Sequence, residues 1–497
     1  MSTHLTRRFL LAALGSVATT GVVLAEAPLV SIHPQPRLGR LRKTALGGPE
    51  KLVAQAGLSG DTAFVVADVK SGLRLEGFND TKGQPPASVA KAVTTLYALD
   101  VLGPEHRFQT RLMATGPVSN GILEGNLYLV GGGDPTLNTD DLAGLAKALK
   151  SAGVREVRGG FRVYDGALPY VHSIDPGQPD PVGYSPAVTG IALNFNRVHF
   201  EWKRNGSGYG VTMDARTERV RPAVQMARMK IAARAAPVYT YEERGGIETW
   251  TVAKAALGKG GARWLPVRRP AEYAGDVFRT LARSHCIDLK AAKTTRSLPS
   301  GTVLAQHNSE PLRVILKNML KYSNNLTAEM VGLAATVKRG QTPGSLKASG
   351  REMSAWAGQK LGMKQTLLVD HSGLGGASRM TPSDLVGALV LVHKRGILRP
   401  LLKPFTLKDA KGRPVKGHPV KVQAKTGTLN FVSGLGGFMT AADGTELAFA
   451  IFSADEKIRA RIKKSDRERP DGARSWSRRS RKLQQQLIER WGQLYGS

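Results

Sequence analysis

The stretch Pro85-Pro86-Ala87-Ser88-Val89-Ala90-Lys91 joins a strand-rich beginning to a helix, and the rest of the chain can be organised around it. Before it, the apolar run at residues 62–69 is typical of a buried strand, and residues 73–77 are predicted to return as its hairpin partner. After it, a helix is predicted from Ser88 to Leu102, where Gly103-Pro104 ends it. A spacing of three places Ser88 and Lys91 on one face of that helix.

This serine–lysine pair is the first of three short motifs that carry chemistry. A serine hydroxyl is a weak nucleophile and needs a base within hydrogen-bonding distance. Lys91 can be that base only if burial or a neighbouring cation lowers its pKa well below the free value of about 10.4. At the first turn of a helix, free backbone N–H groups would also stabilise negative charge that develops beside Ser88. Taken alone, the pattern S-x-x-K also fits an ordinary helix start.

The second motif is Ser323-Asn324-Asn325, in a polar loop between helices predicted at residues 312–320 and 326–337. The Ser323 hydroxyl can pass a proton to a leaving amine. The Asn325 amide can both donate to and accept from a peptide backbone. Taken alone, these residues equally fit an ordinary loop or helix cap.

The third motif is Lys425-Thr426-Gly427-Thr428, which is predicted to begin a strand that ends near Val432. Because Gly427 lacks a side chain, a substrate backbone could lie against this strand as an added β-strand. Thr426 and Thr428 offer hydroxyls, and Lys425 offers a charge, for a terminal carboxylate. An ordinary edge strand with a tight turn would have the same sequence pattern.

Residues 109–295, between the first two motifs, differ from the rest of the chain because predicted strands predominate there. Alternating apolar and polar residues predict strands at 125–130, 157–163, 197–202 and 209–213. After the third motif, a hairpin is predicted from strands at 434–440 and 446–453. The sequence therefore predicts one discontinuous domain, residues 45–108 and 296–497, interrupted by inserted β-rich domains at residues 109–295.

The first 25 residues have the pattern of a secretory signal peptide. Arg7 and Arg8 precede an apolar run from Phe9 to Ala25 that is short for a membrane span. The pattern leaves open the export route, and whether the segment is cleaved or stays as an anchor. Residues 26–44, which contain several prolines, are predicted to form a linker. We therefore expect export to the periplasm.

The chain is strongly basic, with 71 Lys and Arg against 39 Asp and Glu and a formal net charge of +32. Such a charge favours anionic partners. Export, and the lack of a helix-turn-helix, zinc-finger or basic–aromatic pattern, argue against nucleic acid. An anionic wall polymer or an anionic membrane surface therefore remains as the expected partner of the positive charge. Residues 456–497 are especially basic, and apolar residues at helical spacing there, Leu483, Leu487, Ile488 and Trp491, predict an amphipathic helix docked on the body. Its basic face would contact such a partner or simply be solvated.

Cys286 is the single cysteine of the sequence, so no intrachain disulfide can form. We expect it to be a small residue of the core. The sequence contains no Cys/His cluster of the kind that holds a metal.

In this chain order, S-x-x-K, S-x-N and K-T-G form the signature of penicillin-binding proteins and serine β-lactamases. The first two motifs stand much farther apart here than in β-lactamases or the simpler D-alanine carboxypeptidases. With its β-rich insert, the chain resembles the D-alanyl-D-alanine carboxypeptidase/endopeptidase family, the class C low-molecular-mass penicillin-binding proteins, over roughly residues 45 to 495. Further matches are Gly125–Leu129, Gly133–Leu137, Asn194–Arg197 and Asp370–Leu374, although His371 stands where the family usually has glycine.

The resemblance implies an α/β (α+β) protein. Its serine β-lactamase/transpeptidase-like domain would hold an antiparallel sheet flanked by helices, and its insert would form two smaller β-rich domains. The implied substrates are peptidoglycan stem peptides, from which the terminal D-alanine is removed, and D-alanyl–diaminopimelate cross-links. It also implies that β-lactam antibiotics acylate the same serine, and that the reaction requires no metal or cofactor.

The resemblance also assigns roles to the motif residues. Ser88 would form the acyl-enzyme, Lys91 would take its proton, and Ser323 would relay a proton to the departing amine. Asn325 would hold the substrate amide. Lys425, Thr426 and Thr428 would engage the carboxylate beside Gly427, and the N–H groups of Ser88 and Thr428 would form an oxyanion hole. Repulsion from Lys425 is expected to lower the pKa of Lys91.

Two alternatives remain open. One is a β-lactamase or esterase on the same scaffold, which would need fast deacylation. We find no additional glutamate motif between Asn325 and Lys425 to support that. The other is a non-catalytic wall-binding protein that uses the positive charge.

Overall fold

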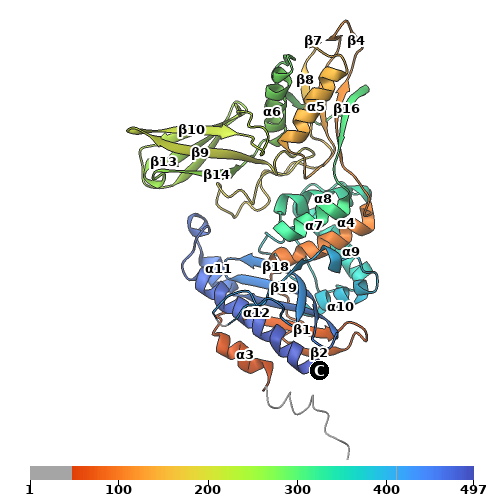
Figure 1. The fold of residues 1–497 in the computed structure, drawn as a ribbon, viewed down its shortest axis with the longest axis vertical. Helices are drawn as coiled ribbons and strands as arrows, with labels where there is room; N and C mark the ends of the chain where they lie inside the picture. Colours follow the sequence, from red (N-terminus) through yellow and green to blue (C-terminus); the bar gives the residue numbers. More distant parts are fainter. Residues whose placement is uncertain (1–46, 410, 497) are drawn as a thin grey trace, which may run out of the picture. The chain divides into compact units, whose positions relative to one another are not determined.

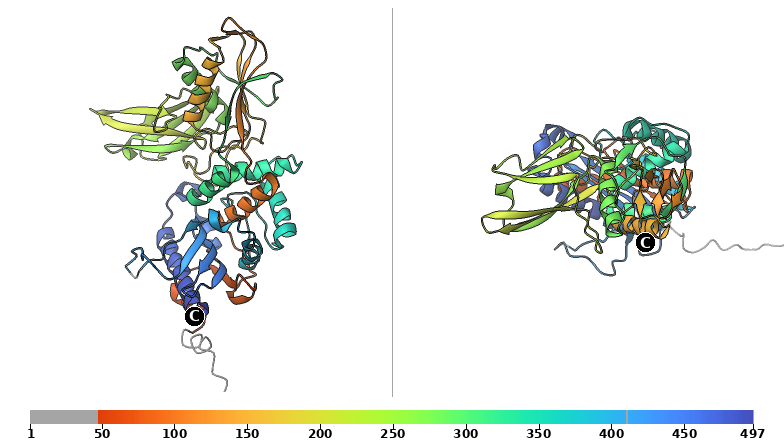
Figure 2. Two further views of the ribbon diagram at one scale, coloured as in Figure 1. Left: turned by 45° about the vertical axis from the view of Figure 1, so that its right-hand side comes forward. Right: turned by 90° about the horizontal axis from the view of Figure 1, so that it is seen from above.

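Strands from the two ends of the chain form one antiparallel sheet. The structure, a computed structural model, describes residues 47–409 and 411–496. Within these residues the sheet has six strands in the order β17-β18-β19-β20-β1-β2, so that β1 pairs with β20 although most of the chain separates them (Figures 1 and 2). Their bounds are β1 Asp61–Asp68, β2 Arg74–Phe78, β17 Lys403–Pro404, β18 Lys421–Leu429, β19 Val432–Thr440 and β20 Glu446–Ala454.

Alternation along β1 explains why both faces of this sheet are covered. Phe64 and Val66 pack on one side with residues of the helix α12 (Ala473–Tyr495), including Leu487 and Trp491. Val65 and Ala67, which point to the other side, belong to the core that the remaining helices cover. Those helices are α4 Ala90–Leu102, α7 Leu312–Tyr322, α8 Asn325–Lys338, α9 Leu346–Leu361 and α10 Pro382–His393. Figure 1 shows α12 along the sheet and α4, α7 and α8 grouped together.

The remaining helical segments are short or follow the last strands. They are α3 Pro49–Ala56, α11 Glu456–Arg461 and the 3₁₀ turns η1 Ala87–Val89, η3 Arg399–Leu401 and η4 Lys464–Asp466. The predicted amphipathic helix at the C-terminus is confirmed as α12, whose predicted apolar positions are all buried.

Residues 109–308 form further sheets with their own hydrophobic core. In the described part of the chain, one sheet has five strands in the order β15-β8-β6-β3-β16, with α5 Thr139–Ser151 and α6 Pro270–Ser284 packed beside its strands. Its strands are β3 Gln109–Ala114, β6 Leu127–Gly131, β8 Phe161–Tyr164, β15 Lys293–Thr295 and β16 Thr302–Asn308.

Three smaller sheets complete this region. They have the orders β10-β9-β14, β11-β13-β12 and β4-β5-β7. Their strands are β4 Val118–Ser119, β5 Ile122–Leu123, β7 Glu156–Val157, β9 Arg197–Asn205, β10 Gly208–Asp214, β11 Ala227–Ala232, β12 Tyr239–Arg244, β13 Ile247–Ala253 and β14 Gly260–Pro266, with the 3₁₀ turn η2 Lys254–Ala256. The predicted fold class is therefore confirmed, because helices flank an antiparallel sheet and a long β-rich segment interrupts that domain's chain.

Some predictions fall outside the described residues or were wrong. The predicted signal peptide (1–25) and linker (26–44) lie outside the described residues. Among the residues described, no helix combines the length and apolar character needed to cross a bilayer. Cys286 is exposed rather than part of the core. It follows the end of α6 in a left-handed conformation with φ 59°, and the next residue, Ile287, takes the buried position.

Candidate active site

Ser88 lies on a tight turn rather than on a regular helix. The predicted helix begins with the 3₁₀ turn η1, and α4 follows from Ala90. Ala87, directly before the serine, has φ 45° and is fully buried. A non-glycine residue rarely adopts this conformation, so the surrounding packing must hold the turn in place.

Lys91 lies beneath Ser88 with no exposed surface. Its Nζ donates to Ser88 Oγ at 3.0 Å, to Asn325 Oδ1 at 2.7 Å and to the Ser372 carbonyl at 2.7 Å. Three acceptors match the three hydrogens of an ammonium group. The first two motifs therefore meet at this one nitrogen.

Burial lowers the pKa of Lys91 to about 8. The buried carboxyls of Glu329 and Asp370 oppose this shift, because negative charge favours the ammonium form. Of the two predicted causes, burial is confirmed, whereas repulsion from Lys425 does not contribute to the lowered pKa of Lys91. A lysine with this pKa exchanges its proton near neutral pH, as a general base must.

The third motif contacts the second on the other side of the site. Lys425 Nζ donates to Ser323 Oγ at 2.9 Å and to the Thr426 carbonyl at 2.7 Å. Burial lowers the pKa of Lys425 to about 6, with smaller contributions from the positive charges of Lys91 and Lys403. Ser323 ends α7 in the left-handed conformation, φ 58°, which turns the chain between the two helices.

The asparagines of the second motif have different tasks. Asn324 is the N-cap of α8, and its side chain accepts a hydrogen bond from Thr327 N at 2.9 Å. Asn325, the next residue, contacts Lys91 through Oδ1, while its Nδ2 donates to the Tyr184 carbonyl at 3.0 Å. The cap thus fixes the start of the helix from which Asn325 reaches the site.

The strand that carries Lys425 differs from the prediction. β18 begins at Lys421 and ends at Leu429, and Val432 already belongs to β19. The residues Asn430 and Phe431 turn the chain between them, with Phe431 at φ 57°. β17 pairs with β18 only at Gln423 and Ala424, so no strand among the described residues covers the outer edge from Lys425 onward.

The packing of the protein itself also requires glycine at position 427. A Cβ atom at this position would lie 2.7 Å from the Pro86 carbonyl oxygen and 3.0 Å from Ser88 N. The glycine therefore makes room for the turn that carries Ser88. The same close approach brings β18 next to the Ser88 N–H.

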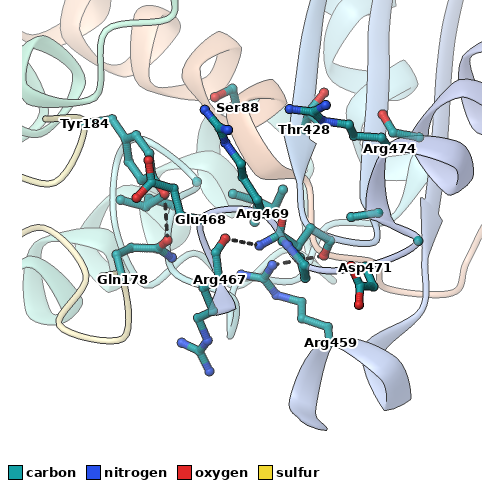
Figure 3. Close-up of a pocket in the computed structure, with 18 of the residues that line it drawn as sticks. Ser88, Gln178, Tyr184, Thr428, Arg459, Arg467, Glu468, Arg469, Asp471 and Arg474 are labelled. Atoms are coloured by element: carbon teal, nitrogen blue, oxygen red, sulfur yellow. Dashed lines mark hydrogen bonds between the residues drawn. The ribbon is translucent and has the colours of Figure 1, made fainter. Parts of the chain in front are cut away.

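A cavity of about 810 Å³ opens over these groups (Figure 3). Of the eight predicted residues, Ser88, Ser323, Asn325 and Thr428 line it, and Lys91 and Lys425 contact three of these from behind. Gly427 underlies the serine turn, and Thr426 is the adjacent half-buried residue of β18. The geometry thus unites three motifs that are far apart in the sequence.

The rim of the cavity contains residues that the sequence analysis missed. Gln178 and Tyr184 come from the insert, and Tyr184 OH donates to Gln178 Oε1 at 3.1 Å. Figure 3 shows arginines of the C-terminal segment gathered around the same opening; the arginines of the lining are Arg459, Arg467, Arg469, Arg474 and Arg481. From sequence, the basic residues of that segment were predicted only to form one face of a helix.

A second omission lies below the site. Glu329 and Asp370 are both buried near Lys91. Part of the signal was present, because Glu329 lies on the helix predicted at residues 326–337; that helix begins at Asn325, so the two side chains share a face. A glutamate motif for deacylation between Asn325 and Lys425 is absent from the sequence, and that criterion does not single out Glu329.

Comparison with known proteins agrees with this arrangement. The family model described as "D-Ala-D-Ala carboxypeptidase 3 (S13) family" matches residues 50–471. The chain belongs to the S13 family. It is 26% identical to a D-alanyl-D-alanine carboxypeptidase of Actinomadura sp. (strain R39), over 86% of this chain and 84% of that protein.

Other S13 relatives extend the likeness to the fold. The chain is 24% identical to the D-alanyl-D-alanine carboxypeptidase DacB of Haemophilus influenzae, over 79% of this chain and 85% of that protein. The crystal structure of penicillin binding protein 4 from H. influenzae superposes with a TM-score of 0.71 at 21% identity, covering 88% of this chain and 99% of that one. The predicted family and fold are confirmed, and the chain is a serine-type hydrolase of the S13 family.

Proposed function

We propose that this S13 hydrolase cleaves D-alanyl peptide bonds of peptidoglycan through an acyl-enzyme on Ser88, as a carboxypeptidase and endopeptidase. The observation that carries the proposal is the contact between Lys91 Nζ and Ser88 Oγ, 3.0 Å, at a nitrogen whose pKa is lowered to about 8. A nucleophile and a base in hydrogen-bond contact are the minimum that serine catalysis requires. Membership of the S13 family supports the substrate class.

The first half of the reaction uses the turn and the strand edge. The substrate's backbone adds to the open edge of β18, with Asn325 Nδ2 bonding its amide in place of the Tyr184 carbonyl. Neutral Lys91 takes the proton of Ser88 Oγ as that oxygen attacks the D-alanyl carbonyl. The N–H groups of Ser88 and Thr428 stabilise the oxyanion, which the close packing of Gly427 against Ser88 N supports.

The second half releases the amine and then the acid. Ser323 Oγ, which accepts a hydrogen bond from Lys425 at 2.9 Å, relays to the departing nitrogen the proton that Lys91 took from Ser88, so that Lys91 is neutral again. Lys425, Thr426 and Thr428 bind the substrate's terminal carboxylate. Water then cleaves the ester, with Lys91 accepting its proton and returning one to Ser88 Oγ.

The experiment that tests the proposal is covalent labelling. Fluorescent penicillin should label the purified chain at Ser88, and digestion of wall fragments should release D-alanine and open cross-links, as read by mass spectrometry. Ser88→Ala should abolish both. Labelling that persists in that variant would disprove the assignment. Cephalosporin turnover faster than D-alanine release would indicate a β-lactamase, and wall binding without any Ser88-dependent chemistry would indicate a binding protein.

We further propose that the protein acts in the periplasm and that its basic C-terminal surface contacts anionic wall polymer. The charge of +32 supports this, as does a row of exposed basic residues along the first half of α12: Arg474, Arg478, Arg479, Arg481 and Lys482. Binding to an anionic wall fraction should weaken as salt is raised. Equal retention by neutral polymer would argue against the contact.

A further inference from the structure

One buried carboxylate has no part in the reaction described above. Glu329 lies on α8, one helical turn after Asn325, and has no exposed surface. Its two oxygens accept consecutive main-chain hydrogen bonds, Oε2 from His371 N at 3.0 Å and Oε1 from Ser372 N at 2.9 Å. Burial, and then the nearby Asp370 carboxyl, raise the pKa of Glu329 to about 8, whereas the two main-chain donors and Lys91 favour its ionised form.

The segment that Glu329 holds is a tight loop, residues 370–375. Asp370 accepts hydrogen bonds within it from Gly373 N and Gly375 N, both at 2.6 Å. Two buried carboxylates thus order four amides of one short loop. Burying such groups is costly unless every donor is well placed, so the loop is held in one conformation.

The loop touches the proposed catalytic pair at two points. The Ser372 carbonyl accepts the hydrogen bond from Lys91 Nζ at 2.7 Å. Gly373, at φ 74°, lies so close to the serine turn that a Cβ atom there would be 1.9 Å from the Ala87 carbonyl oxygen. The loop therefore supports both the lysine and the unusual backbone that precedes Ser88.

We infer that Glu329 is a positioning residue for the Ser88–Lys91 pair, acting through the 370–375 loop. Without its two acceptors, the Ser372 carbonyl would no longer be fixed against Lys91, and the support beneath Ala87 would loosen. The inference rests on the proposed function, because it gives Glu329 a role in acylation at Ser88. Misplacing a catalytic group by about 1 Å can cost on the order of 100-fold in rate.

The chain offers a matched control in Glu248. This residue of β13 is also fully buried, and its Oε1 accepts two consecutive main-chain hydrogen bonds, from Arg268 N at 2.8 Å and Arg269 N at 2.7 Å. It lies in the insert, and among the described residues it makes no hydrogen bond to the three motifs. Glu248→Gln therefore measures the general cost of replacing such a carboxylate by an amide.

The experiment compares penicillin acylation rates of the full chain as wild type, Glu329→Gln, Glu248→Gln and Glu329→Asp, from pH 5 to 9. Glu329→Gln should slow acylation roughly 10- to 100-fold, whereas Glu248→Gln should acylate at the wild-type rate even if it melts at a lower temperature. Glu329→Asp keeps the charge but is too short for both N–H groups, so its rate should lie between.

The pH profile separates positioning from simple loss of structure. The titratable groups around Lys91 are Glu329 on α8, Asp370 on the loop and Lys425 on β18, while burial keeps neighbouring His371 neutral. The Glu329 carboxylate raises the pKa of Lys91. Glu329→Gln should therefore move the midpoint of the alkaline rise to lower pH, and Glu329→Asp should leave it in place. A fraction of unfolded protein would lower the amplitude without moving the midpoint.

The outcomes distinguish the two proposals. If wild-type protein is not labelled at Ser88, the proposed function is wrong. If the wild type is labelled but Glu329→Gln matches Glu248→Gln in both rate and midpoint, the positioning role alone is overturned. If Glu329→Gln does not fold, Glu329→Asp decides: a wild-type rate in that variant would overturn the inference.

Discussion

The floor and the rim of the cavity use different basic residues. At the floor lie two lysines, Lys91 and Lys425, both buried and both with a lowered pKa. The rim is formed by arginines, of which Arg469 and Arg474 are exposed. Lysine loses its proton readily when buried, whereas arginine stays charged and can form several hydrogen bonds to an anion at once.

This difference separates chemistry from binding. A lysine at the floor can be neutral at the pH at which it must accept a proton. An arginine at the rim, such as Arg467, which donates to the Gly177 carbonyl at 2.6 Å, holds the chain and offers fixed positive charge. The comparison therefore predicts that changes at the floor alter rate constants, and that changes at the rim alter affinity.

The largest effect is expected from Lys91→Arg. The variant keeps a positive charge beside Ser88 but removes the amine that contacts Ser88 Oγ and becomes neutral near pH 8. Penicillin acylation should fall by about 10³- to 10⁴-fold, because loss of one member disables a catalytic unit. Stopped-flow labelling measures the rate. A loss below tenfold would mean that another group takes the proton of Ser88.

A smaller loss is expected from Lys425→Arg. Lys425 contacts Ser323 Oγ and has a pKa of about 6, so it is largely neutral at pH 7 and can take part in the proton relay. A permanently charged arginine cannot, and kcat for D-alanine release should fall about 100-fold. KM should change less. An increase in KM alone would mean that Lys425 acts only in binding the substrate's carboxylate and not in the proton relay.

The next effect is the pH dependence of the wild type, whose acylation rate should change about tenfold per pH unit. The pKa of Lys91 is lowered from its ordinary value of 10.5 to about 8. The fraction of neutral Lys91 therefore increases with pH and levels off above pH 8. The acylation rate should rise about tenfold per unit below pH 8, and more steeply below pH 6, where Lys425 also gains its proton. Labelling rates over pH 5 to 10 test this. The steeper portion should disappear in Lys425→Arg.

Much of the floor could be predicted from sequence because it depends on short local patterns. Ser88 and Lys91 are three residues apart at the start of one helical segment, so their spacing alone places them on the same face. Asn325 lies at the start of another helix. Chain order then identified the family. The apolar period of α12 was equally local, and its buried positions were as predicted.

The rest depends on contacts that no local pattern encodes. The role of Glu329 is visible only once residues 370–375 fold against α8. The strand of Lys425 was misplaced because Asn430 and Phe431 form a turn without glycine, so the usual sequence signal was missing. Tyr184 reaches Asn325 from the insert, a long-range contact that the strand pattern gave no reason to expect.

The smallest predicted effect concerns the rim itself. Arg469 and Arg474 line the cavity and are exposed, so each contributes screened attraction rather than a buried ion pair. Arg469→Gln and Arg474→Gln should each raise KM for anionic wall peptides about two- to fivefold at low salt, with kcat unchanged. Steady-state assays at low and high salt measure this, and the difference from wild type should shrink as salt increases.

The matched control for the rim is Arg313→Gln. Arg313 is an exposed residue of α7 that pairs with Glu105 at 3.3 Å and does not line the cavity, so removing its charge changes the net charge equally. If Arg313→Gln raises KM as much as the rim variants do, the overall charge of +32 attracts the substrate and the rim has no special part. If the rim variants lower kcat instead, the division between a reactive floor and a binding rim is wrong, because an arginine that cannot exchange protons would then be acting in the chemical step.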